Sequence, residues 1–97
     1  MINVGLYYKV KEGHEKEFEN KFNEVVNFLK NNYPGLKQAK LYKSVEEPRE
    51  YLIYTEWDSL ETFRKFISSY EYKGTVDYGK SIIEGRPYHK VFQEINS

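Results

Sequence analysis

The spacing of apolar residues changes several times along this chain, and this change constrains the fold more than any other feature. Residues 2–10 alternate strictly, with Ile2, Val4 and Leu6 beginning one face, which predicts a half-buried strand. From about residue 13 to residue 31 the apolar residues recur at helical spacing, which predicts an amphipathic helix. That helical stripe consists of Phe18, Phe22, Val25, Val26 and Leu29.

The middle of the chain returns to strand and then to helix. Residues 36–45 form a polar strand whose three lysines indicate a position near a sheet edge. Residues 51–57 are rich in Tyr, Ile, Thr and Trp and predict the strongest strand. Asp58 is placed to cap a second helix, with Glu61 completing a capping box. The apolar face of that helix carries Leu60, Phe63, Phe66, Ile67 and Tyr70.

The last third of the chain is only partly determined by its pattern. Within residues 71–85, Gly74 and Gly79 each weaken a helix by about 1 kcal/mol relative to Ala, so the state of this segment stays open. Residues 88–95 predict the final strand, which Pro87 allows only at its start or at a sheet edge.

Taken in order, these elements give a β-α-β-β-α-β chain, the ferredoxin-like arrangement. The fold class is therefore α+β, a single domain over residues 1–97, with a four-stranded antiparallel sheet and helices on one face. The other face would carry aromatic residues such as Tyr7 and Tyr51 among lysines, a large semi-apolar surface for a monomer. We expect a homodimer in which two such faces pair into a dimeric α+β barrel.

Composition excludes several classes of function. Fifteen basic and fifteen acidic residues give no net charge, which argues against nucleic-acid partners and against a polybasic membrane surface. The absence of cysteine excludes disulfides, thiolate metal sites and cysteine nucleophiles. No apolar run approaches the ~20 residues of a membrane span, and Met1 leads into a strand rather than a signal peptide. A cytoplasmic location is expected.

Aromatic residues make up 18% of the chain, and the composition leaves their role open. They suit a tightly packed core, and they equally suit an interface or an apolar pocket.

The two histidines predict no metal site. His14 opens the first helix among glutamates and is expected at the surface, whereas His89 lies in the final strand. His89 shares its strand face with Val91 and Ile95, which predicts a partly buried side chain. A hydrogen-bonded core histidine is the favoured role, ahead of a general base or a ligand.

Familiar catalytic and nucleotide-binding motifs are absent. No serine stands in a nucleophile elbow, and there is no G-x-G-x-x-G or Walker-type loop. Residues 50–57 also lack the glycines and the basic start that the RNA-binding motif of βαββαβ domains requires.

Two short motifs stand where strands lead into helices. Residues 54–59 are Tyr-Thr-Glu-Trp-Asp-Ser, followed by Phe63 and Phe66, and residues 10–15 are Val-Lys-Glu-Gly-His-Glu. Their order and spacing resemble the antibiotic-biosynthesis-monooxygenase-like family of dimeric α+β barrels, over essentially the whole chain. In that family an aromatic-x-Glu-Trp-acidic-Ser run leads into the second helix, and V-x-x-G-x-E leads into the first.

The resemblance implies several possible activities. The family includes cofactor-independent monooxygenases of polyphenols and quinols, haem-degrading enzymes, and members without an established activity. The haem-degrading branch uses an Asn in the first strand, a Trp in the second helix and a haem-ligating His beyond it. By spacing, those positions hold Leu6, Phe66 and Val76 in this chain, so the resemblance implies no haem degradation by that mechanism.

The expected function is oxygenation of a small electron-rich aromatic, such as a quinol, in an apolar pocket and without a cofactor. His89 is the candidate catalytic base. The expected ligand-binding residues are Leu6, Tyr8, Tyr54, Phe66 and Tyr70. Two alternatives stay open: a non-catalytic protein that binds haem or a hydrophobic metabolite, and a dimer whose pocket is filled by its own side chains.

Overall fold

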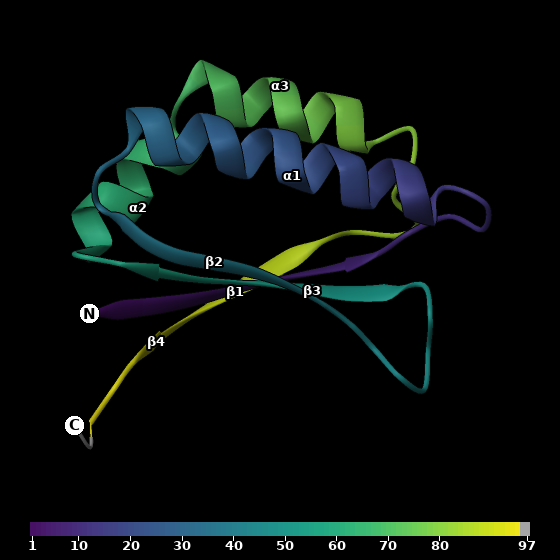
Figure 1. Ribbon diagram of the computed structural model, residues 1–97, viewed down its shortest axis with the longest axis horizontal. Coiled ribbons are helices and arrows are strands. Elements are labelled where there is room, and N and C mark those ends of the chain that lie inside the picture. Colours follow the sequence, from purple (N-terminus) through teal and green to yellow (C-terminus); the bar gives the residue numbers. More distant parts are fainter. Residues whose placement is uncertain (96–97) are drawn as a thin grey trace.

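The computed structural model describes residues 1–95, which fold into one layer of sheet covered by one layer of helices (Figure 1). The predicted ferredoxin-like α+β class is confirmed, with one additional helix, α3, between α2 and the last strand. In chain order the elements are β1 Ile2–Lys9, α1 Glu15–Asn32, β2 Leu36–Lys43, β3 Glu50–Trp57, α2 Leu60–Ile67, α3 Tyr70–Gly79 and β4 Tyr88–Gln93.

The four strands form an antiparallel sheet in the order β2-β3-β1-β4. In the central strand β1, Val4 stands opposite Thr55 of β3 on one side and Val91 of β4 on the other. The strands β2 and β4 are therefore the edges, as the lysines of β2 predicted. All three helices cover the same face of this sheet (Figure 1).

The core lies between the sheet and the helices, around Trp57. This side chain is 1% exposed, and its ring stacks on Phe66 and meets Phe63 edge on, both at 5.6 Å between ring centroids. Its indole N–H donates to the Thr55 hydroxyl at 2.9 Å, which donates in turn to the Val4 carbonyl at 3.0 Å. The buried polar groups of this chain of contacts are therefore satisfied within the sheet.

The helix α2 starts one residue later than the sequence predicted. Its N-cap is Ser59, whose hydroxyl oxygen accepts a hydrogen bond from the Thr62 backbone N–H at 3.2 Å. Asp58 instead donates its backbone N–H to the Gly35 carbonyl at 2.8 Å, which joins the turn before β2 to the start of α2. A side chain at Gly35 would collide with Thr62 and Asp58, so this close approach requires glycine.

The segment that the sequence left open contains α3. Ser69 caps this helix by accepting a hydrogen bond from the Tyr72 backbone N–H at 3.1 Å. Because Ser68 and Ser69 interrupt the preceding helix, Tyr70 begins α3 and is 88% exposed, and it does not extend the apolar face of α2. No residue of α3 is buried, so the helix shows no continuous apolar stripe.

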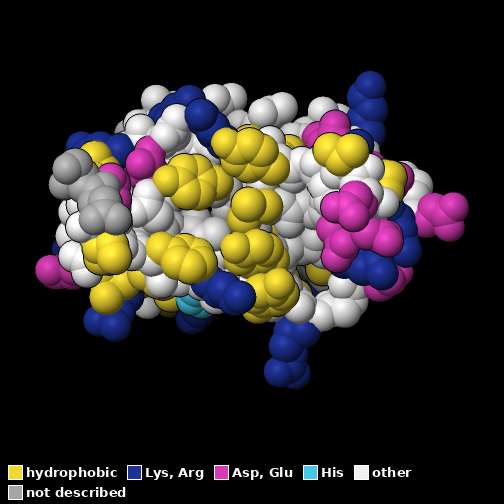
Figure 2. Space-filling model, turned by 90° about the horizontal axis from the view of Figure 1, so that it is seen from below, with side chains coloured by type: hydrophobic (Ala, Val, Ile, Leu, Met, Phe, Trp, Pro, Cys, Tyr) yellow, Lys and Arg dark blue, Asp and Glu magenta, His cyan; other side chains and the backbone are white. Residues whose placement is uncertain are grey.

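The sheet face opposite the helices, here called the open face, carries a cluster of hydrophobic side chains (Figure 2). The rings of Tyr7 and Tyr88 stack on it with 4.8 Å between their centroids. The Tyr7 ring lies over Gly5, where a Cβ would come within 3.1 Å of the Tyr7 hydroxyl oxygen. Tyr42 and Phe92, on the two edge strands, are about half exposed.

The prediction that Tyr51 lies on the open face is wrong. Its side chain is 3% exposed on the helix-covered side, and its hydroxyl donates to the Glu19 carboxylate of α1 at 2.5 Å. Tyr51 shares its strand face with Ile53 and Trp57, and alternation directs all three toward the helices.

Candidate functional site

A cavity of 390 Å³ lies between the sheet and the helices. This volume falls in the range of about 300–1,000 Å³ typical of ligand pockets. Every strand and every helix contributes to the lining, which is mainly aliphatic and aromatic. The apolar wall includes Leu6, Phe18, Ile53, Trp57, Phe63 and Phe66.

Four tyrosines are among the described lining residues, and two of them, Tyr8 from β1 and Tyr72 from α3, present their hydroxyl groups to this apolar lining. The Tyr78 hydroxyl donates to Glu17, and the Tyr88 ring stacks on Tyr7 on the open face. Burial, together with the neighbouring Tyr72 phenol, raises the pKa of Tyr8 far above its ordinary value. Burial also raises the pKa of Tyr72. Both phenols therefore stay protonated at neutral pH. Neither hydroxyl has a hydrogen-bond partner within residues 1–95, so both are available to a bound molecule.

His89 stands at the mouth of the cavity. The pairing of β4 places it opposite Leu6 on the helix-covered side of the sheet, and its ring meets Phe63 edge on at 5.6 Å. The expected partial burial is wrong for this chain, because β4 is an edge strand and all of its residues are exposed. The imidazole forms no hydrogen bond with the described part of the chain, so it is no satisfied core histidine.

Four of the residues predicted from the sequence come together at this cavity. Leu6 and Tyr8 reach it from the middle of the sheet, Phe66 from α2 and His89 from β4.

Tyr54 and Tyr70 lie outside the cavity, which corrects the expectation that they line it. Alternation along β3 directs Tyr54 to the open face, where its hydroxyl accepts a hydrogen bond from the Asn3 side-chain amide at 2.6 Å. Tyr70 points away because it is the first residue of α3.

Sequence reasoning missed Tyr72, which replaces Tyr70 as the tyrosine that α3 brings to the cavity. The available signal was the Ser68-Ser69 pair, which is typical of a helix cap and marks the start of a new helix. If a new helix is taken to begin after Ser69, its helical period directs Tyr72 rather than Tyr70 toward the sheet.

The three positions that, by the spacing of the sequence resemblance, correspond to the Asn, Trp and His of the haem-degrading branch line the cavity in this chain. They hold Leu6, Phe66 and Val76, which have no hydrogen-bonding or metal-ligating atoms. Within the described residues there is also no group of three or more side chains that could hold a metal ion. His14, as expected, is a surface residue, and its Nδ1 lies 3.0 Å from the Glu17 carboxylate.

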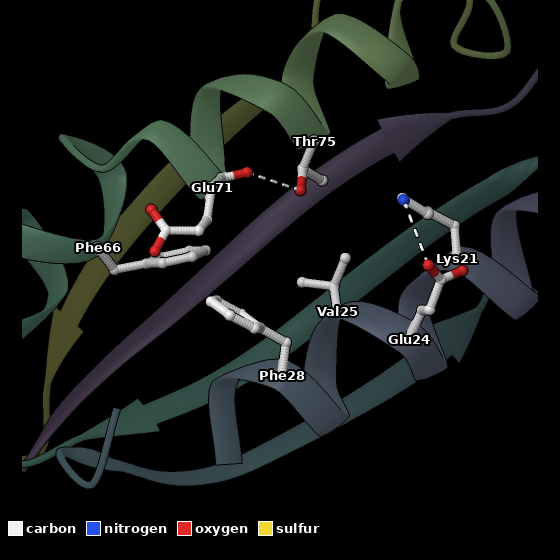
Figure 3. A pocket seen from close by; sticks show the side chains of 7 residues that line it. All are labelled: Lys21, Glu24, Val25, Phe28, Phe66, Glu71 and Thr75. Carbon is white, nitrogen blue, oxygen red and sulfur yellow. Dashed lines mark hydrogen bonds and ion pairs between the residues drawn. The ribbon is translucent and has the colours of Figure 1, made fainter. Parts of the chain in front are cut away.

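A smaller groove of 230 Å³ lies on the outside, between α1 and the pair α2 and α3 (Figure 3). Most of its polar groups are partnered: Lys21 pairs with Glu24 at 3.7 Å, and the Thr75 hydroxyl donates to the Glu71 backbone carbonyl at 3.0 Å. Lys21, Val25, Phe66 and Thr75 line both this groove and the cavity, so the two spaces are neighbours. The cavity is the better candidate site because it is larger and because the Tyr8 and Tyr72 hydroxyls and the His89 imidazole in its lining have no hydrogen-bond partner within the described residues.

Residues 1–78 match the sequence profile of the family described as antibiotic biosynthesis monooxygenase. The chain belongs to this family. None of the helices in the described part combines the length and the apolarity needed to cross a bilayer.

A protein of Haloquadratum walsbyi, provisionally named a heme-binding protein, is 30% identical over 86 residues, which cover 89% of this chain and 16% of the relative. The chain thus spans about a sixth of that relative's length.

Solved structures of low sequence identity share the fold. A Caulobacter crescentus protein, provisionally described as an antibiotic biosynthesis monooxygenase, superposes with a TM-score of 0.89 at 21% identity, covering 98% of this chain and 90% of that one. SnoaB of Streptomyces nogalater, described as a cofactor-independent oxygenase, gives 0.84 at 17% identity, covering 99% and 94%.

Proposed function

We propose that this chain binds a small electron-rich aromatic molecule, such as a quinol, in the cavity and promotes its oxygenation without a cofactor. The observation that carries the proposal is an aromatic-lined cavity of 390 Å³ with two protonated tyrosine hydroxyls inside and an imidazole at its mouth. Membership of the monooxygenase family and the likeness to SnoaB support it.

In this chemistry the substrate supplies the electrons. A base removes a phenolic proton, and the resulting electron-rich phenolate passes electrons to molecular oxygen. One oxygen atom forms a bond to a ring carbon that carries hydrogen and, as the C–H and O–O bonds break, becomes the second carbonyl of a quinone. The other oxygen atom leaves as water with the proton from that carbon and the phenolic proton. The phenol loses four electrons and the oxygen molecule accepts four, so no further reductant is consumed.

The lining residues suit the separate parts of this reaction. His89 is the imidazole among the described lining residues, and neither of its ring nitrogens has a hydrogen-bond partner there, so the one without a hydrogen would be the acceptor of the phenolic proton. Tyr8 and Tyr72 are donors rather than bases, because their raised pKa values keep them protonated; they would orient a ring oxygen. The apolar wall would keep water away from reactive intermediates.

The proposed working unit is a homodimer formed through the open face. Tyr42, Tyr88 and Phe92 are about half exposed there, and a soluble monomer rarely leaves a continuous patch of this kind uncovered. Pairing of two open faces would leave both cavities on the outer, helix-covered sides.

Oxygen uptake with dihydroxynaphthalene, in the presence of a metal chelator, tests the proposal. We expect uptake above the uncatalysed rate, and His89→Gln should lower it by about 10²–10⁴-fold, the usual contribution of a general base. His14→Gln is the matched control, because His14 is a surface imidazole that is not among the residues lining the cavity. Uptake no faster than the uncatalysed rate across a panel of quinols would contradict catalysis.

A second candidate function is non-catalytic binding of haem or of another hydrophobic metabolite, which the name of the Haloquadratum relative favours. Leu6, Phe66 and Val76 do not fit haem breakdown, and His89 is the imidazole at the cavity that could ligate iron. The third possibility, a pocket filled by side chains, fits poorly with a cavity of 390 Å³.

A further inference from the structure

We infer that the natural ligand is a small aromatic acid whose ring enters the apolar cavity and whose carboxylate binds Arg86 at the mouth. The inference rests on the proposed function, because it names the class of substrate for the same cavity. Beyond the proposed function, the inference states that the substrate carries a negative charge and that Arg86 recognises this charge.

The first observation is the sign of the charges around the cavity. The charged side chains in the described lining are Lys21, Lys80 and Arg86, and no Asp or Glu is among them. The whole chain contains fifteen acidic and fifteen basic residues, so its composition does not explain this asymmetry. A lining with cations and no carboxylates favours an anionic ligand.

The second observation is that only one of these cations lacks a partner within the described residues. Lys21 pairs with Glu24 at 3.7 Å, and Lys80 pairs with Asp77 at 3.4 Å. Lys21 also lies over the Tyr78 ring, 4.7 Å from its centroid. Arg86 forms no ion pair and no hydrogen bond with residues 1–95. Its guanidinium is therefore free to form two parallel hydrogen bonds with a carboxylate.

The third observation is the position of Arg86 relative to the polar groups of the interior. It lies in the segment that joins α3 to β4, three residues before His89, and both residues are exposed while lining the cavity. A carboxylate placed deep among aromatic side chains would lose its hydration without compensation, so the acidic group belongs at the mouth. The opposite end of the ring would then meet the hydroxyls of Tyr8 and Tyr72.

Two fluorescent probes of similar shape and different charge test this inference. Anilinonaphthalene sulfonate is an anion, and phenylnaphthylamine is its uncharged counterpart. In fluorescence titrations the full-length protein should bind the anion about tenfold more tightly, as expected for a charge-assisted hydrogen-bonded pair. Arg86→Gln should remove this preference and leave the affinity for the neutral probe unchanged. The matched control is Arg64→Gln, since Arg64 is an exposed arginine of α2 outside the cavity lining.

Two further measurements locate the probes and define the acid. Val76→Trp, which places a large ring at the cavity wall, should abolish binding of both probes; retained binding would put them elsewhere and overturn the inference. Naphthoate should displace the anion, whereas displacement by protoporphyrin alone would overturn the assignment to a small acid. Equal affinity for both probes, or a preference that survives Arg86→Gln, would also overturn it. Oxygen uptake by the parent protein with neutral dihydroxynaphthalene involves neither Arg86 recognition nor the probes, so it judges the proposed function separately.

Discussion

At the scale of single residues, Trp57 serves both the core and the candidate site. Its indole N–H is held by Thr55, its ring packs against Phe63 and Phe66, and one side of it faces the cavity. A side chain with this many packing and hydrogen-bond contacts is suited to holding the neighbouring lining residues in place rather than to reacting with a ligand. The lining is therefore rigid where β3 meets α2.

Replacement of Trp57 by Ala should destabilise the fold strongly. Loss of burial and the resulting void should cost about 3–5 kcal/mol in the free energy of unfolding, measured by urea denaturation. Phe28→Ala, at a ring that is 36% exposed on α1, is the control and should cost less. Unchanged stability combined with altered ligand binding would show that Trp57 acts mainly on the ligand.

A second residue-scale prediction concerns haem. Because Leu6, Phe66 and Val76 offer no ligating or hydrogen-bonding atoms, we expect at most weak haem uptake and no breakdown. The Soret band of added hemin should persist when an electron donor is supplied. Stoichiometric binding with progressive loss of this band, abolished by His89→Ala, would place the protein among the haem oxygenases.

The sequence predicted correctly which side chains point toward the helices where one face of a strand was clearly apolar. In β1 the inward residues Leu6 and Tyr8 follow from strict alternation. In β3 both faces carry large apolar or aromatic residues, so alternation alone does not decide which one faces the helices. Tyr51 and Tyr54 were consequently placed on the wrong sides. Their positions depend on pairing with β1, which aligns Thr55 with the buried Val4.

At the scale of elements, the strands and α1 could be predicted because each has an apolar period of its own. The helix α3 could not, because it buries no residue completely and part of its contact with α1 is polar. The Tyr78 hydroxyl donates to Glu17, and Lys21 lies over the same ring. Such contacts between surface groups leave no periodic mark in a sequence.

The capping of α2 offers a direct test of where that helix begins. Ser59→Ala should lower the free energy of unfolding by about 1 kcal/mol, since it removes the acceptor for the Thr62 N–H. Asp58→Ala, at the position that the sequence pattern favoured, should have the smaller effect. Denaturant unfolding of the two variants checks the order, and a larger loss for Asp58→Ala would restore the capping box as the helix start.

Because α3 lacks buried residues, it should open more readily than α1. We expect its backbone amides to exchange with deuterium faster than those around Val26 and Leu29, which are buried in α1. Tyr78→Phe should speed exchange in α3 further by removing the hydroxyl that reaches Glu17. Mass-spectrometric exchange resolves both segments, and equal protection of α1 and α3 would contradict a loosely held helix.

At the scale of the whole molecule, the cavity and the open face lie on opposite sides of the sheet. The helix-covered side holds the cavity, and the open face holds an exposed cluster of hydrophobic side chains. We predict a homodimer through the open face, with an interface above the ~1,000 Å² expected of a specific contact. Sedimentation at micromolar concentration should give twice the monomer mass of 11.7 kDa.

The Phe92→Lys substitution tests the predicted dimer interface. Phe92 lies on the open face of β4 and outside the cavity lining, so a charge there should weaken the dimer without changing the candidate site. Val45→Lys adds the same charge at a residue that is 97% exposed between β2 and β3, and this control should remain dimeric. A monomeric parent protein, or a Phe92→Lys variant as dimeric as the control, would mean that the open face is not the interface. Probe binding by a folded Phe92→Lys monomer would further show that each cavity is complete within one chain.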